Sequence, residues 1–204
     1  MWASHSESPL QADELCHALA VERGYRDLNA QSVPSIKTLL GCCLGLVSVE
    51  APSSTVRLVR FTLQEYLTQT PGLFHTPHAM IAEVCLTYLS FRSIMKLEFL
   101  PYTRSPAPIL SYASRHWVTH ARWGFNENVK PLVCSLLGVY DRNISDRLFL
   151  WNIMSNLSPE SWRPGFTGLH CAAYHGFSEI MVDLLDKKQW NPNVVDLEGN
   201  TAIM

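Results

Sequence analysis

Four histidines in the sequence have the type and spacing that could bind a metal ion. His116 and His120 lie one helical turn apart, which is the spacing of two zinc ligands on a helix. His75 and His78 flank Pro77 and could form a second pair of ligands. No third type of ligand lies near His116 and His120 in the sequence. We therefore expect no metal site and interpret these histidines as exposed or helix-capping side chains.

Two further pairs could take part in catalysis. Cys16 and His17 are the residue types of a nucleophile and its base, but neighbours on a helix point about 100° apart. Asp13 and Glu14 could act as a general acid and base, yet two acids are also typical of a helix N-terminus, where the helix dipole favours them. We identify no catalytic or cofactor-binding residue and expect that the chain is not an enzyme.

Composition excludes several classes of function. The chain has 204 residues, of which 17% are charged, and a formal net charge of −2, which rules out a basic body that binds phosphates. No apolar run approaches the ~18 residues that span a bilayer, and no signal peptide is visible. The six cysteines lie among apolar helical positions or side by side, so we interpret them as free thiols. These features predict a cytoplasmic protein without a membrane partner.

The positions of these side chains depend on the elements that carry them, and residues 1–70 contain two helical patterns. Ala12–Leu19 and Ser35–Cys43 are the two predicted helices. The residues expected on the apolar face of the first helix are Leu15, Ala18 and Leu19.

A hairpin follows these helices. Leu46–Glu50 and Val56–Phe61 alternate between apolar and polar residues on either side of the turn Ala51–Ser54, and Thr62–Leu67 predicts a short closing helix. We expect three side chains to face the helices and three to face outward: Leu46, Val59 and Phe61 inward, Glu50, Arg57 and Arg60 outward. Helix, helix and hairpin is the order of a winged helix.

Residues 71–162 are predicted to be helical, with an irregular segment at Leu100–Pro108 that contains three prolines. Four apolar stripes recur at helical spacing. Their members are Ile81, Val84, Cys85, Tyr88 and Leu89; Leu110, Ala113, Trp117 and Ala121; Val129, Leu132, Val133, Leu136, Leu137 and Tyr140; and Leu148, Leu150, Trp151, Met154 and Leu157.

Residues 163–204 contain an internal repeat. A segment that opens at Thr167 returns at Thr201, a period of 34 residues, which is close to the 33 of an ankyrin repeat. The Gly-x-Thr-x-Leu-His-x-Ala-Ala pattern resembles the ankyrin motif. The matching positions are Gly165, Thr167, Leu169, His170, Ala172, Ala173, Gly176, Glu179, Leu184, Leu185, Asp196, Gly199 and Thr201.

The ankyrin resemblance implies a role for each of these positions. Thr167 and His170 would fix the turn before the first helix, the two alanines would let two helices pack closely, Gly176 would end the first helix, and the leucines would fill the space between repeats. Two departures are Gly168, where the family has proline, and Lys187–Trp190, which lacks the usual glycine. We expect one full repeat and one truncated repeat, with Ile180, Leu184 and Trp190 lacking a downstream partner.

The upstream part of the chain resembles the winged helix that follows the nucleotide-binding domain in fungal-type NACHT proteins, which are STAND-class signalling ATPases, several of which end in ankyrin arrays. The segments that carry this resemblance are Pro9–Leu10, Asp13–Glu22, Val33–Leu40, Cys43–Val47 and Ser53–Leu67. This winged helix also carries a label taken from a glycolipid inositol deacylase, which implies no deacylase chemistry here. The phosphate-binding Gly-x-x-x-x-Gly-Lys-Ser/Thr loop is absent, because no glycine precedes a lysine. The expected chain is thus a fragment whose winged helix lacks its first helix.

The resemblance implies a mainly α fold with a small β-hairpin: a winged helix at 1–70, a helical bridge at 71–162 and a partial ankyrin solenoid at 163–204. The implied function is non-catalytic protein interaction and regulation in signal transduction. The implied partners are the nucleotide-binding domain of the parent architecture and an unidentified ankyrin ligand, with no cofactor. The alternative is a nucleic-acid-binding winged helix, although Ser35–Cys43 offers only Lys37 as a cation.

Overall fold

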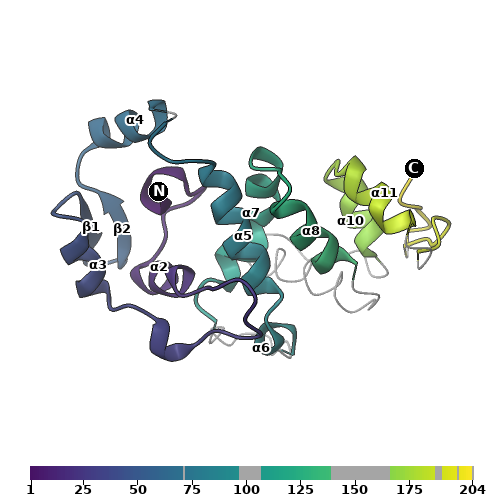
Figure 1. Ribbon diagram of the computed structural model, residues 1–204, viewed down its shortest axis with the longest axis horizontal. Coiled ribbons are helices and arrows are strands. Elements are labelled where there is room, and N and C mark those ends of the chain that lie inside the picture. Colours follow the sequence, from purple (N-terminus) through teal and green to yellow (C-terminus); the bar gives the residue numbers. More distant parts are fainter. Residues whose placement is uncertain (71, 97–106, 139–165, 187–189, 197, 204) are drawn as a thin grey trace. The chain divides into compact units, whose positions relative to one another are not determined.

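The computed structural model describes residues 1–70, 72–96, 107–138, 166–186, 190–196 and 198–203. The chain divides into two compact units, Met1–Gly124 and Phe125–Met204. The described residues are mainly helical and include one small antiparallel sheet, which confirms the predicted mainly α fold class with a β-hairpin (Figure 1). The helices of the predicted middle region, 71–162, are shared between the two units.

The first unit begins with short helices and a hairpin. The elements are α1 (Trp2–His5), α2 (Ala12–Leu19), α3 (Ile36–Cys42), β1 (Val47–Glu50), β2 (Thr55–Leu58) and α4 (Phe61–Gln69), with a 3-10 turn at Ala30–Ser32. At the start of α2, the Gln11 N–H donates to Glu14 Oε2 at 2.8 Å. Asp13 and Glu14 therefore occupy the first turn of a helix, as predicted. At the start of α3, the Ser35 hydroxyl accepts a hydrogen bond from the Thr38 N–H at 3.1 Å.

The hairpin pairs Val47 with Leu58 and Glu50 with Thr55, around the predicted turn. The segment before α2 lies alongside it. The Val56 N–H donates to the Leu10 carbonyl at 2.8 Å, and the Ala12 N–H donates to the Ser54 carbonyl at 2.8 Å. These bonds attach the N-terminal segment to β2.

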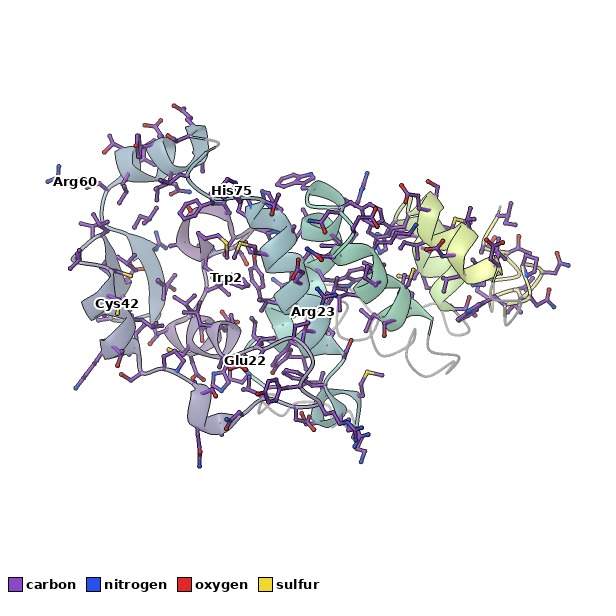
Figure 2. The ribbon with its side chains drawn as sticks, in the orientation of Figure 1. Trp2, Glu22, Arg23, Cys42, Arg60 and His75 are labelled. Carbon is purple, nitrogen blue, oxygen red and sulfur yellow. The ribbon has the colours of Figure 1, made fainter. Side chains whose placement is uncertain are left out.

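The predicted inward face of the hairpin is wrong at three positions. Leu46, Val59 and Phe61 are 53%, 54% and 72% exposed. The strands are shorter than the alternating pattern, so Leu46 precedes β1, Val59 follows β2, and Phe61 opens α4 instead of ending a strand. Val56 is the strand residue that is buried. The charged residues predicted to face outward are exposed, and Figure 2 shows Arg60 projecting away from the first unit.

The apolar face predicted for α2 also needs a correction. Leu19, at the last position of the helix, is 47% exposed, whereas Cys16 and Ala18 are buried. The buried side of the helix carries Cys16 and Ala20, one turn apart, whereas Leu15 and Leu19 share a neighbouring side that is only partly covered.

The core of the first unit lies along α5 (Pro77–Leu89) and α7 (Leu110–Trp123), which pack side by side, with α6 (Arg92–Met95) following α5 (Figure 1). Both predicted stripes are confirmed, except that Val84 is only partly covered. Ile81, Cys85 and Leu89 on α5 are completely buried. Gly124, directly after α7, has no room for a side chain, because a Cβ there would overlap the backbone of Ala79. The two helices therefore meet closely at this end.

The second unit is built from α8 (Val129–Leu137), α10 (Gly168–Tyr174) and α11 (Ser178–Asp186). Each of these helices packs against the other two. Ile180 and Leu184 on α11 are completely buried, although they were expected to lack a downstream partner, so they need none to be covered. The reason is that α8 covers them, and Lys130 on α8 also forms ion pairs with Glu179 and Asp183, each at 3.2 Å.

Several predictions fall outside the described residues. These are Tyr140, the fourth apolar stripe at 148–157, most of the irregular segment 100–108, and Gly165. Residues 187–189 of the segment that lacks the usual ankyrin glycine also lie outside them. All six cysteines are described and are free thiols, as predicted: Cys42 is exposed, Cys43 is partly covered, and the other four are buried. Within the described part of the chain, no helix combines the length and apolarity needed to cross a membrane.

Candidate functional site

The most completely assembled of the predicted ankyrin positions are Thr167 and His170, at the start of α10. The Thr167 N–H donates to His170 Nδ1 at 3.2 Å, and the His170 N–H donates back to Thr167 Oγ1 at 3.4 Å. Because Nδ1 accepts, the hydrogen of the neutral imidazole lies on Nε2, which donates to the Asn200 carbonyl at 3.1 Å. One histidine thus joins the first turn of a helix to a turn 30 residues later.

The turn that receives this hydrogen bond is organised by Asp196. Its Oδ1 accepts from the Glu198 N–H and the Asn200 N–H, both at 2.9 Å, and a single antiparallel bridge pairs Val195 with Thr201. Burial alone would raise the pKa of the Asp196 carboxyl, but the hydrogen bonds from Asn200 and Glu198 outweigh it and hold the pKa below its usual value. The predicted positions Asp196 and Thr201 therefore belong to one folded turn.

The remaining predicted ankyrin positions lie on or beside the same two helices. Gly176 has a φ of +73° and ends α10, as its predicted role requires. Gly199 has a φ of +84° in the turn that Asp196 organises. Leu169, Ala172 and Leu184 are buried, Ala173 and Leu185 are partly covered, and Glu179 is exposed.

The departure at Gly168 has a physical cause. A Cβ at this first position of α10 would overlap the carbonyl oxygen of Leu137, the last residue of α8. Proline would place its ring carbons in the same space. The close approach of α8 therefore requires glycine where the ankyrin pattern has proline.

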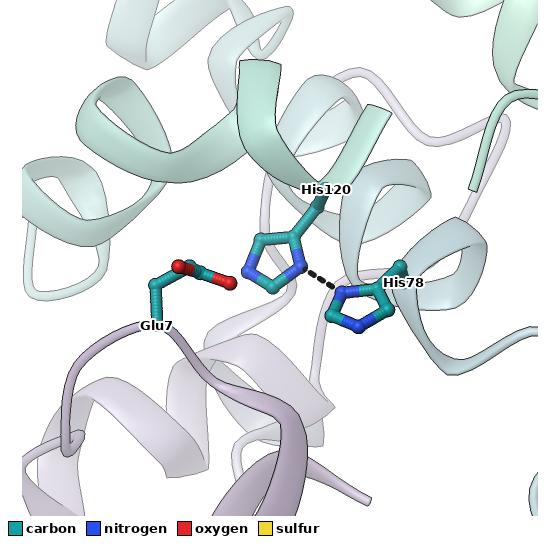
Figure 3. Close-up of side chains that lie close together, drawn as sticks. All are labelled: Glu7, His78 and His120. Carbon is teal, nitrogen blue, oxygen red and sulfur yellow. Dashed lines mark hydrogen bonds between the residues drawn. The ribbon is translucent and has the colours of Figure 1, made fainter. Parts of the chain in front are cut away.

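A second cluster lies in the first unit and was not predicted from the sequence. Glu7, in the segment before α2, His78, in the first turn of α5, and His120, near the end of α7, place one possible ligand atom each within 4.8 Å of one another (Figure 3). The Nδ1 atoms of His78 and His120 are 2.9 Å apart. The ring centroids are 5.1 Å apart, nearly the largest separation that this distance allows, so the imidazoles meet edge to edge through their nitrogens.

Tyr112 holds His120 from the other side. Its hydroxyl lies 2.8 Å from His120 Nε2 and accepts a hydrogen bond from the Glu7 N–H at 3.2 Å. One turn away, His116 Nε2 lies 3.2 Å from the Ser8 hydroxyl. The N-terminal segment is thus bonded to α7 at two successive residues.

Burial keeps these imidazoles neutral. It is the main reason that the pKa of His120 falls to about 3, and the nearby His78, His116 and His5 lower it further. Burial also lowers the pKa of His78 and His5. For His116, burial and then the charge of Arg115 lower the pKa to about 4. A neutral imidazole has a free nitrogen lone pair, so these groups can bind a metal ion or share a hydrogen bond at neutral pH.

The structure corrects the interpretation of the histidines. His120 is completely buried and His116 is partly buried, so they are not exposed or capping side chains. His78 meets His120, which is 42 residues away, whereas His75 is exposed and lies outside the cluster. A search for ligands at short spacing could not find this arrangement, because its members come from three separate segments.

The other candidate pairs remain apart from this cluster. Cys16 is buried, and burial raises the pKa of its thiol. His17 instead lies beside Asp13, with its Nδ1 3.3 Å from an oxygen of that carboxylate. The structure therefore does not place His17 as a base for Cys16.

Comparison with known proteins identifies no relative of the chain. It matches no protein family, and neither a curated protein nor a solved structure matches it.

Proposed function

We propose that the chain is a non-catalytic, cytoplasmic protein-interaction segment that combines a winged helix with an ankyrin-type unit, as in NACHT-type signalling ATPases. The observation that carries this proposal is the hydrogen bond from His170 to the Asn200 carbonyl. It ties the start of one repeat to the turn that opens the next, which is the contact that a repeat protein needs between neighbours. The six free thiols support the cytoplasmic location.

The winged-helix part of the proposal is supported by the arrangement around the hairpin. The short helices α1, α2 and α3 precede β1 and β2, and Leu10 and Gln11 form a further extended segment beside β2. The order of elements agrees with the family resemblance. A winged helix of this kind would contact another protein domain, and its state-dependent contacts would make it regulatory.

The ankyrin-type unit offers apolar side chains for a protein partner. Tyr174, at the end of α10, is 73% exposed, and Val182, on α11, is 56% exposed. Aromatic side chains such as that of Tyr174 are enriched at protein–protein contacts. We propose that these two residues contact the partner of the repeat.

The alternative, nucleic-acid binding, finds little support in the geometry. On α3, Lys37 is the only cation. Arg57, on the strand after the wing, has its Nε 3.4 Å from Glu50 Oε2, so an acid partly neutralises it. Binding to a duplex needs several cations that replace counterions.

Photo-crosslinking tests the proposed function. A photoreactive amino acid is placed at Tyr174 or at Val182 in the full chain, and at Glu65 on α4 as an exposed control. We expect the first two positions, but not the control, to crosslink the same protein. That protein, once purified, should bind the full chain in a saturable way in calorimetry, and the double variant Tyr174→Ser/Val182→Ser should weaken the binding at least tenfold.

Two results would overturn the proposal. One is that the crosslinked protein, once purified, shows no saturable binding to the full chain, or that it binds the full chain and the double variant with equal affinity. The other is tight binding of a labelled DNA or RNA duplex that weakens steeply as salt is raised, which would establish the alternative.

A further inference from the structure

The first unit contains a set of ligand atoms that the proposed function does not use. We propose that His78, His120 and Glu7 form a binding site for a zinc-type divalent transition-metal ion, which ties the N-terminal segment to α5 and α7. Two imidazole nitrogens and one carboxylate oxygen are a donor set that suits zinc and its first-row neighbours. The three ligand atoms already lie within 4.8 Å of one another, before any ion is present (Figure 3).

The two imidazoles must change both their separation and their direction to hold such an ion. In a tetrahedral zinc site with bonds of about 2.0–2.1 Å, two ligand nitrogens lie about 3.3 Å apart. The His78 and His120 Nδ1 atoms are 2.9 Å apart, so they need to separate by only a few tenths of an ångström, but because they point toward each other, each ring must also rotate by about 35° to direct its lone pair at the ion. The ion would replace the hydrogen that the two nitrogens share.

Glu7 completes the set from the solvent side. Its carboxylate is exposed and, among the described residues, makes no hydrogen bond or ion pair, so it can move toward the imidazoles without breaking an existing contact. Glu7 also lines a groove of about 410 Å³ beside β2 and α4. Because the Glu7 carboxylate is exposed, a water molecule can take the fourth position on the ion.

Tyr112 supplies the outer support that a metal-binding histidine commonly has. When His120 Nε2 donates its hydrogen to the Tyr112 hydroxyl at 2.8 Å, the Nδ1 lone pair is left facing His78. The Tyr112 hydroxyl is itself held by the Glu7 N–H, so the backbone of one ligand residue helps to orient another. Burial raises the pKa of Tyr112, so its hydroxyl stays protonated and acts only through hydrogen bonds.

Titration of the full chain with Zn²⁺, and with Co²⁺ as a spectroscopic probe, tests the site. The background carries Cys42→Ser and Cys43→Ser, because these neighbouring thiols are the least buried and could bind zinc themselves. We expect one ion per chain, a Co²⁺ spectrum without thiolate bands, and a rise in the unfolding temperature as Zn²⁺ is added. Glu7→Gln and His78→Gln should each weaken Zn²⁺ binding at least tenfold.

The matched controls are His75→Gln, which removes an exposed histidine from the loop directly before α5, and Glu65→Gln, which removes an exposed acid from α4. Neither should change the affinity. Glu7→Gln keeps the proposal testable even if the histidine variant does not fold, because its side chain lies at the surface. The proposal is overturned if the background protein binds no Zn²⁺ below about 100 µM, or if the ligand variants bind it as tightly as the controls.

Discussion

At the residue scale, Asp196 is a buried carboxylate that serves as the centre of a turn. It accepts hydrogen bonds from two backbone N–H groups, so only a side chain with an acceptor atom could replace it. Its position in the sequence was predicted from the repeat, but its partners were not, because they depend on how residues 195–201 fold back on themselves.

Asp196→Ala should destabilise the second unit by about 1–3 kcal/mol, because two N–H groups lose their acceptor. The folded-state pKa of Asp196 lies below its unfolded value, so this contribution is present above the unfolded pKa and is lost as the pH falls through the folded pKa. In urea unfolding at pH 7 and at pH 3, the free energies of unfolding of the variant and the parent should therefore differ less at the lower pH. Asp186→Ala, at the exposed end of α11, should have little effect at either pH.

The partly buried His116 should make the stability of the first unit depend on pH between about 4 and 6.5, a range above that of Asp196. Its pKa is about 4 in the folded chain and would be about 6.5 when unfolded, so the unfolded state binds more protons between these values. The stabilisation is complete above about pH 6.5 and declines as the pH falls toward 4. His116→Gln should make the first unit less sensitive to acid, by about 1–2 kcal/mol between pH 7.5 and pH 5. An equal loss of unfolding free energy between pH 7.5 and pH 5 in the parent and in His116→Gln would contradict this prediction.

At the scale of elements, the sequence predicted local structure well and long-range packing poorly. The bounds of α2 agree with the predicted Ala12–Leu19, because a capping acid and an apolar face at helical spacing define a helix locally. The exposure of Phe61 could not be predicted, since alternation does not show how far the core reaches along a strand. The meeting of His78 with His120 depends on how α5 packs against α7.

The contact between α8 and α10 gives a prediction at this scale. Gly168→Ala should destabilise the second unit by about 1–3 kcal/mol, because the new Cβ overlaps the Leu137 carbonyl and pushes the helices apart. Gly41→Ala is the matched control in the last turn of α3, where a Cβ meets no atom within 4 Å. It should be neutral or stabilise the first unit by about 0.5–1 kcal/mol. Thermal unfolding of both variants measures the difference.

At the scale of the whole molecule, the described residues of the two units form cores of different size. The first is built on α5 and α7, helices of 13 and 14 residues, whereas α8, α10 and α11 have 9, 7 and 9. A smaller core buries less apolar surface and is less stable. We therefore expect the second unit to open first when denaturant is added.

The rate at which a thiol reagent labels each cysteine measures the order in which the two units open. In the folded protein a thiol reagent should label Cys42 first and then Cys43, because the other four are buried. Burial raises the pKa of Cys171 to about 12, which further slows its reaction. At low denaturant, Cys134 and Cys171 in the second unit should become labelled before Cys16 and Cys85 in the first. Mass spectrometry of the labelled peptides gives the order, and simultaneous labelling of all four would show a single cooperative unit.

The bonds between the N-terminal segment and α7 also determine the order of events during synthesis. Glu7 and Tyr112 are 105 residues apart, and Ser8 and His116 are 108 apart. At about 5–20 residues per second, a ribosome needs about 5–20 s to make the chain between such partners. Throughout that time α1 has no α7 to pack against. Trp2, which is buried in the folded first unit, therefore lacks its ring contact with Tyr112 during this interval and is more accessible to enzymes and chaperones that act on nascent chains.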